Sequence, residues 1–245
     1  MSRNTLVLGA LLSCASVSHA AFTTFDFETD DSGAVLVNGQ DIMSPDEFGS
    51  FASVSSSGGN AGAAIFDSDP MGPNAGGPDP DLLVGLGNIL ILQNGGSATQ
   101  STPGIFDTPN DASNGGAITF DITSPTELLS IDLIDVDGGN TMELTLTDSA
   151  GLVRTYSVGN SWTNDVTDMP AGFDTLDLST LSDQLGEGGG IATATEDQGF
   201  DPSSVVRLRV GINGSGGIDN LTFVPTPGAA ALMGLAGIAT MRRRR

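Results

Sequence analysis

Lysine is absent from this sequence, and cysteine and histidine each occur once, as Cys14 and His19. The eight basic residues are therefore all arginines. Both Cys14 and His19 lie in a leader that is predicted to be removed. Without them the mature chain excludes disulfides, Cys/His zinc sites, histidine-based triads, Schiff-base lysines and a P-loop lysine. Composition alone thus excludes most classes of active site, and we expect a protein that is not an enzyme.

The first twenty residues have the parts of a secretory signal peptide. Arg3 supplies a positive n-region, residues 6–12 an apolar h-region, and Ser18-His19-Ala20 a cleavage site with small residues. The segment that follows, 22–28, changes abruptly to strand-like alternation. The sequence therefore predicts export, with cleavage after Ala20.

The other end of the chain has three parts: a proline motif, an apolar run and a basic terminus. The motif is Val224-Pro225-Thr226-Pro227, the run covers 229–241, and the terminus is Arg242, Arg243, Arg244 and Arg245. As a helix the run would span about 20 Å, against about 30 Å for the hydrocarbon core of a bilayer. Arginines behind such a run hold the C-terminus inside while the rest of the chain lies outside. We therefore predict a short helix that lies in the membrane before it is processed.

This three-part arrangement resembles the PEP-CTERM sorting signal of bacterial envelope proteins, which an exosortase, a membrane transpeptidase-like protease, reads. Thr226 stands where the motif usually has Glu. Segments at 64–69, 79–82, 87–92, 132–138 and 217–221 are similar to segments that precede the signal in many PEP-CTERM proteins. The resemblance implies exosortase as a partner and three parts: the leader (1–20), an ectodomain (21–223) and the sorting signal (224–245).

The middle of the chain is strongly acidic. It contains all 30 acidic residues and three arginines, Arg154, Arg207 and Arg209, so its net charge is −27. Nucleic acids and anionic membrane surfaces are excluded as partners, because their phosphates would repel this charge. Cations are the natural partners.

Period-two alternation of apolar residues predicts strands at 141–147, 152–158, 206–210 and 218–223. We expect 128–147 to form a hairpin around Asp137-Gly138-Gly139-Asn140, with 152–158 as the third strand of a meander. The run 89–92 is apolar on both faces and predicts a central strand. Residues 55–63 and 71–80 are predicted to be loops, and 175–185 is the one plausible short helix. The sequence therefore predicts an all-β protein, an antiparallel β-sandwich of jelly-roll type.

Acidic side chains without counter-charges are either solvated, protonated or bound to metal, and oxygen ligands select hard cations, Ca²⁺ above all in an exported protein. Three acidic groups are candidate calcium sites, with solvated surface acids as the alternative for each. The first group is Asp132, Asp135, Asp137, Asn140 and Glu143; the second is Asp67, Asp69, Asp79 and Asp81; the third is Asp26, Glu28 and Asp219. The third group resembles the jelly-roll carbohydrate-binding modules, in which a structural calcium links the first and last strands.

Trp162 is the one tryptophan and lies in the polar segment 159–164. It is a candidate platform for a sugar ring, with a cap on the edge of the sandwich as the alternative; the eleven phenylalanines are expected to fill the core. The predicted function is that of an exported structural or adhesive protein of the cell surface or extracellular matrix, with extracellular polysaccharide as a candidate partner. The alternatives are a calcium-dependent glycan-binding module and a carboxylate-based glycoside hydrolase.

Overall fold

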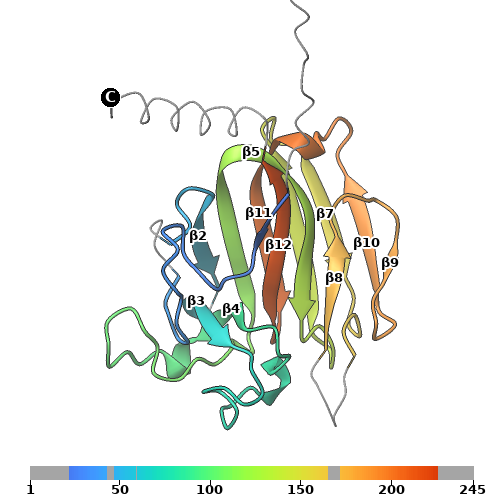
Figure 1. Ribbon diagram of the computed structural model, residues 1–245. Helices are drawn as coiled ribbons and strands as arrows, with labels where there is room; N and C mark the ends of the chain where they lie inside the picture. Colours follow the sequence, from blue (N-terminus) through green and yellow to red (C-terminus); the bar gives the residue numbers. More distant parts are fainter. Residues whose placement is uncertain (1–21, 43–46, 59, 165–171, 226–245) are drawn as a thin grey trace, which may run out of the picture.

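The structure, a computed structural model, describes residues 22–42, 47–58, 60–164 and 172–225. Within these ranges the chain consists of strands, loops and short 3-10 helices (Figure 1). The strands are β1 (Thr23–Phe25), β2 (Ala52–Ser57), β3 (Asn60–Asp67), β4 (Asn88–Asn94), β5 (Gly116–Ile134), β6 (Thr141–Asp148), β7 (Val153–Val158), β8 (Phe173–Asp177), β9 (Gln184–Leu185), β10 (Ile191–Glu196), β11 (Val205–Asn213) and β12 (Gly217–Pro225). The 3-10 helices are η1 (Pro80–Leu82), η2 (Gly95–Ser97) and η3 (Pro202–Ser204). The prediction of an all-β protein is confirmed.

The strands pair antiparallel in the order β3-β4-β12-β5-β11-β6-β7-β10-β9, and β1, β2 and β8 pair beside this path. β3 and β4 lie on one side of the molecule and β9 on the opposite edge (Figure 1). Neighbours in this order are often distant in sequence, because β12 is inserted between β4 and β5. The last strand is therefore a central one.

The long strand β5 belongs to two sets of partners. Its first half pairs with β2 on one side and β11 on the other, whereas its second half pairs with β12 and β8. The change of partners falls at the exposed residues Thr123, Ser124 and Pro125, where proline offers no backbone N–H to a neighbouring strand. β5 thus joins two halves of a sandwich-like fold.

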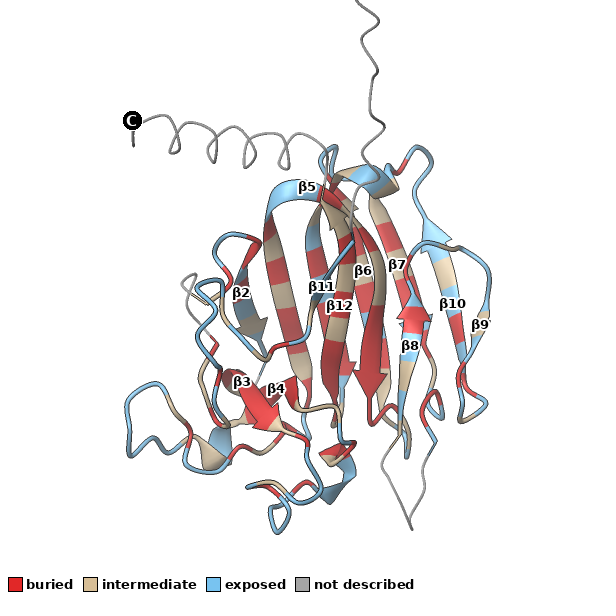
Figure 2. Cartoon of the chain, in the orientation of Figure 1, coloured by how far each residue is buried: buried red, intermediate tan, exposed pale blue. Residues whose placement is uncertain are grey.

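The main core lies against both sets of strands. Met142, Leu144 and Leu146 of β6 are at most 2% exposed, while Thr141 and Glu143 of the same strand point outward, as the period of two predicted. Buried residues follow the central strands and exposed residues are concentrated in the loops (Figure 2).

Five phenylalanines form a cluster in this core, at the place where the first and last strands meet. The Phe51 and Phe223 rings are stacked with centroids 4.2 Å apart, and Phe48 packs edge-to-face on Phe25 at 4.8 Å. Phe27 completes the cluster, 5.9 Å from Phe48. Such aromatic pairs contribute roughly 0.5–1.5 kcal/mol each beyond the area they bury.

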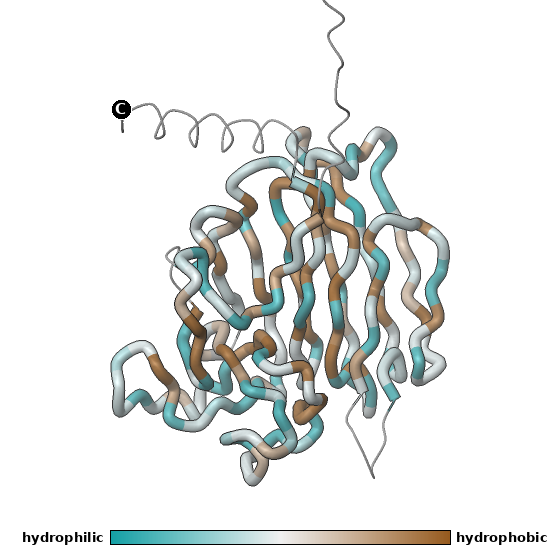
Figure 3. The backbone as a smooth tube through the Cα atoms, viewed as in Figure 1, coloured by the Kyte–Doolittle hydropathy of each residue, from teal (hydrophilic) through white to brown (hydrophobic). Residues whose placement is uncertain are grey.

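A second, smaller core lies on the other face of β3 and β4. Phe66, Ile89 and Ile91 pack there with Leu82 and Phe106 from the loops that follow β3 and β4. Residues 89–92 are at most 1% exposed, so the prediction of a strand buried on both faces is confirmed. Hydrophobic residues are accordingly dense around β3 and β4 (Figure 3).

The predicted hairpin over 128–147 is wrong. β5 and β6 do not pair with each other: the second half of β5 pairs with β12 and β8, and β6 pairs with β11 and β7. The Asp137–Asn140 turn instead carries the chain from one set of strands to the other. The β6–β7 hairpin of the predicted meander is present, with Leu144 opposite Tyr156.

Residues 175–185 contain no helix, and this prediction is also wrong. They contain the end of β8 and then β9. Local hydrogen bonds account for the difference: the Asp177 carboxylate accepts from Ser179 N at 2.8 Å, and the Gln184 side chain binds both backbone groups of Asp177. Side chains that bind nearby backbone groups compete with helix formation.

Residues 55–63 were predicted to be a loop, but most of them belong to β2 and β3. Ser53 and Ser55 point outward while Ala52 and Val54 are buried, so the strand alternates with serine as its polar member. Serine and glycine are typical of loops, and here they conceal the period of two. The other predicted loop, 71–80, is a loop except for Pro80, which begins η1.

Arg154 on β7 is the buried arginine of the described chain, with 5% of its surface exposed. It forms an ion pair with Glu196 at 2.8 Å and donates to the Leu178 carbonyl at 3.1 Å, and it lies 4.7 Å from the centroid of the Phe200 ring. The Tyr156 hydroxyl donates to the same Leu178 carbonyl. This network attaches the segment after β8 to the sheet.

Candidate functional site

Four carboxylates gather where the first and last strands of the described chain meet: Asp26 and Glu28 after β1, Asp132 on β5 and Asp219 on β12. We call them the carboxylate cluster. Asp219 and Asp132 are directly opposite each other in the β12–β5 register, an arrangement in which like charges destabilise a sheet. The charges of Asp132, Asp26 and Glu28 all act on Asp219. The structure thus brings together the residues of the third predicted group and adds Asp132, which the sequence placed in the first.

Asp219 is the most perturbed member of the carboxylate cluster. Only 1% of the residue is exposed. Its Oδ2 accepts a hydrogen bond from Asn220 at 3.1 Å, but its buried Oδ1 has no hydrogen-bond partner. Burial, followed by the charges of Asp132, Asp26 and Glu28, raises the pKa of Asp219 to about 8. An ionised Asp219 therefore requires a cation that the described residues do not supply.

The other three carboxylates have hydrogen-bond donors. Asp132 accepts from the Thr175 hydroxyl at 2.5 Å and from Asn220 Nδ2 at 2.8 Å. Glu28 Oε1 accepts from the backbone N–H of Asn88 at 2.8 Å, and Asp26 Oδ1 accepts from Glu28 N at 3.2 Å. These bonds hold the carboxylates in place, so the cluster is positioned by β5, β8 and β4 as well as by the first and last strands.

The backbone between Asp26 and Glu28 is in an uncommon conformation. Phe27 has φ of +53°, in the left-handed region that bulky residues rarely occupy. Its ring is 1% exposed within the phenylalanine cluster, and this packing offsets the local cost. Asn220, beside Asp219, has φ of +48°. Both strained residues adjoin the carboxylate cluster.

A second acidic group, which we call the loop cluster, consists of Asp79, Asp81, Asp111 and Asp135. The charges of these carboxylates act on one another. Asp79 accepts from the Asp111 backbone N–H at 2.9 Å, and Asp111 accepts from Gly216 N at 2.8 Å and from the Ser215 hydroxyl. Burial is the main reason that the pKa values of Asp79 and Asp135 are each raised to about 7.

The loop cluster combines residues that the sequence placed in separate groups. Asp79 and Asp81 came from the second predicted group and Asp135 from the first. Nothing in the sequence marks Asp111, which lies in a polar loop, and it was missed. The charge of Asp137 contributes to the raised pKa of Asp135, and Asp137 accepts from the Thr163 hydroxyl at 3.4 Å.

Asp67 and Asp69, the remaining predicted ligands, have a different role. Asp67 Oδ1 accepts from Asp69 N at 2.9 Å, and Asp69 Oδ1 accepts from Met71 N at 2.8 Å. These are turns in which a side chain replaces a backbone acceptor. The two residues shape the loop after β3. No described contact joins them to the loop cluster.

Trp162 is not an exposed platform, and that prediction is wrong. Its residue is 1% exposed, and its indole Nε1 has no hydrogen-bond partner among the described residues. The glycine-rich segment 186–190 covers it: a Cβ on Gly186 would lie 2.7 Å from the indole ring. The four glycines of this segment let its backbone close over the ring. The local sequence around Trp162 does not reveal this packing partner.

The predicted sorting signal falls mostly outside the described residues. Val224 and Pro225 form the end of β12, where Val224 is paired with Glu127 and its carbonyl accepts from the Thr126 hydroxyl at 2.7 Å. Thr226, Pro227 and the terminal arginines, Arg242 to Arg245, lie beyond the described chain, as does the predicted signal peptide. In the part of the chain that is described, no helix has the length and apolar character needed to cross a bilayer.

Across the described ranges, no three Asp, Glu, His or Cys side chains already have the spacing of a metal-binding group. The members of the carboxylate cluster are close enough to raise the pKa of Asp219. Like charges keep carboxylates apart, so the four side chains would have to move together to ligate one ion.

Comparison of the sequence with known protein families and with curated proteins finds no match.

Proposed function

We propose that this chain is an exported, non-enzymatic protein of the bacterial cell surface or extracellular matrix, with a structural or adhesive role, whose fold is stabilised by Ca²⁺ at the carboxylate cluster. The leader peptide and the three-part C-terminus support export and sorting by an exosortase. In this proposal the C-terminal helix lies in the inner membrane until it is processed. We assign the sandwich-like fold to the jelly-roll type.

One observation carries the calcium part of the proposal: the buried Asp219 Oδ1 without a partner, at the junction of the first and last strands. A buried carboxylate oxygen is normally hydrogen-bonded, protonated or bound to a cation. The four carboxylates of the cluster offer only oxygen ligands, which suit a hard cation, and Ca²⁺ accepts six to eight such ligands in flexible geometry. Asp219, Asp132, Asp26 and Glu28 would hold the ion and so bridge β1, β5 and β12.

Thermal unfolding tests this part. Extracellular calcium modules bind with dissociation constants of about 10⁻⁴–10⁻³ M. At a dissociation constant of about 10⁻⁴ M, 1 mM Ca²⁺ would stabilise the fold by about 1.4 kcal/mol, which corresponds to a rise in Tm of about 3–6 °C for a domain of this size. Asp219→Asn should abolish the rise. Asp183→Asn, a change at an exposed loop residue, should leave it intact, and a wild-type Tm that is equal in Ca²⁺ and in chelator refutes the calcium site.

Mass spectrometry of the protein from its native cells tests the sorting part independently. The expected mature chain begins at Ala21 and lacks the terminal arginines. Cell-associated protein that retains Met1 and Arg245 would contradict export and processing, whatever the calcium result.

A further inference from the structure

A shallow groove of about 620 Å³ crosses the outer face of the sheet and shares no residue with the carboxylate cluster. It runs over β5, β11, β6, β7 and the start of β10. Gly211 forms part of its floor: it pairs with Ala117 and Glu143 between Arg209 and Asn213, and the Arg209 guanidinium lies over it, with Nη1 3.0 Å from the place of a Cβ. The volume lies within the usual range for small-ligand sites.

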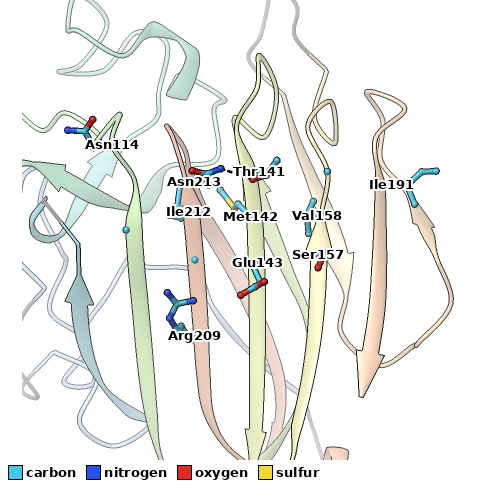
Figure 4. Close-up of a pocket in the computed structure, with 13 residues that line it drawn as sticks. Asn114, Thr141, Met142, Glu143, Ser157, Val158, Ile191, Arg209, Ile212 and Asn213 are labelled. Carbon is cyan, nitrogen blue, oxygen red and sulfur yellow. Dashed lines mark hydrogen bonds between the residues drawn. The ribbon is translucent and has the colours of Figure 1, made fainter. Parts of the chain in front are cut away.

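Two charged side chains of opposite sign lie in the groove. Arg209 on β11 and Glu143 on β6 are diagonal neighbours across the strand pair, with Ser157 beside Glu143 on β7 (Figure 4). Both are exposed. Neither makes a hydrogen bond or an ion pair with any residue in the described ranges, whereas Arg207, two residues earlier on β11, is paired with Asp121 at 2.6 Å.

A row of hydroxyl side chains continues from the groove across the neighbouring strands. Arg209 pairs with Thr119 on one side and Thr145 on the other. The same row continues through β2, β7 and β10, so that one line across the sheet reads Ser55, Thr119, Arg209, Thr145, Thr155 and Thr195. Neighbouring strands are about 4.8 Å apart, so the row offers a regular line of donors and acceptors to an extended ligand.

The two charged side chains in the groove balance each other. Arg209 and Glu143 cancel, although the chain from 21 to 224 has a net charge of −27. An anionic ligand would be repelled by the surrounding field, and a cationic ligand would meet Arg209. An apolar ligand would leave the guanidinium, carboxylate and hydroxyl groups desolvated without partners. An uncharged ligand rich in hydroxyl groups can donate to Glu143 and accept from Arg209.

We propose that this groove binds a neutral oligosaccharide segment, with Arg209 and Glu143 as its principal hydrogen-bonding residues. Arg209 supplies up to five donors and Glu143 accepts. Ser157, Thr145 and Asn213 can do both, and Ile191, which is 53% exposed at the rim, offers an apolar contact to a sugar ring. The proposal goes beyond the calcium site and does not depend on it.

Binding of the full-length protein to a panel of immobilised hexasaccharides tests the proposal. The panel contains neutral hexamers of glucose, mannose, galactose and xylose, with hexamers of galacturonate and mannuronate as the anionic arm. At least one neutral hexamer should bind, and Arg209→Met should weaken this binding about tenfold or more, the loss expected when bonds from a charged donor are removed. Arg207→Met is the matched control and should change it less than twofold.

Several outcomes overturn the proposal. These are no binding to any neutral hexamer, a preference for the uronate hexamers, and equal loss in Arg207→Met and Arg209→Met. An unchanged Tm of Arg209→Met is required, since the Arg209 side chain is exposed and forms no ion pair or hydrogen bond with a described residue. If the Tm of Arg209→Met falls, Glu143→Gln provides the second test and should show the same loss of binding. Binding should persist in chelator, which separates failure of the groove from failure of the calcium site.

Discussion

Removal of one buried carboxyl group should change how the stability of the protein depends on pH. The pKa of Asp219 is raised from 3.8 to about 8 in the folded state. Between these values the folded chain holds a proton that the unfolded chain has released. The free energy of unfolding in chelator therefore falls as pH rises, by about 1.4 kcal/mol per pH unit for this group. By pH 7 the accumulated loss is on the order of 4 kcal/mol.

Asp219→Asn keeps the shape of the side chain and removes the titration. In chelator we expect its free energy of unfolding at pH 7 to exceed that of the wild type by up to this amount, and the two proteins to converge near pH 4. Asp79 and Asp135, whose pKa values are also raised, contribute a further decrease with pH in both proteins. The variant should thus have a shallower dependence, not a flat one.

Urea unfolding at half-unit steps from pH 4.5 to 8 measures this difference. Asp183→Asn, at an exposed loop position, controls for the loss of one surface charge. Parallel curves for Asp219→Asn and the wild type would refute the reasoning, because they would mean that Asp219 does not retain its proton on folding. A wild-type curve that flattens above pH 6 when 5 mM Ca²⁺ is added would link the same carboxyl group to the proposed ion.

Two further predictions concern stability away from the carboxylates. Arg154→Met leaves the partly buried Glu196 carboxylate without its cation and removes one of the two donors to the Leu178 carbonyl, and it should lower the free energy of unfolding by roughly 2–4 kcal/mol. Arg207→Met breaks an exposed pair and should cost about 0–1 kcal/mol; equal effects of the two changes in urea unfolding would disprove the Arg154 network. Gly186→Ala places a Cβ 2.7 Å from the buried indole and should cost roughly 1–3 kcal/mol, while Gly76→Ala, which meets no atom within 4 Å, should be neutral. A Gly186→Ala protein with the wild-type Tm would show that the covering segment moves freely.

Strand positions could be predicted from sequence where one face is apolar and the other polar. Residues 141–147 alternate Thr, Met, Glu, Leu, and the structure buries the apolar members. Partners could not be predicted in the same way. The glycine-rich turn at 137–140 indicates that the chain changes direction, but β5 satisfies its hydrogen bonds with β12 and β8, which are distant in sequence. Local pattern specifies a strand, and long-range packing selects its neighbour.

The acidic groups show the same limit. Asp79 and Asp135 are 56 positions apart and were assigned to different groups, yet both belong to the loop cluster with Asp111. Their association depends on how the loop after β3 folds. The spacing of the residues in the sequence does not predict that fold. Trp162 is the converse case, because its polar neighbours suggested exposure, while a glycine segment more than twenty residues later covers it.

The position of β12 has a mechanical consequence. Thr23 at the start of β1 lies opposite Phe223 near the end of β12, so the two ends of the described chain are neighbours. A protein held at the end that follows β12 would carry tension directly into a strand flanked by β1 and β4 on one side and β5 on the other. Such a strand yields only when both flanks shear together, and an ion shared between β12, β5 and the residues after β1 would link the three segments near the start of β12, at the end of the strand opposite to where the pull enters.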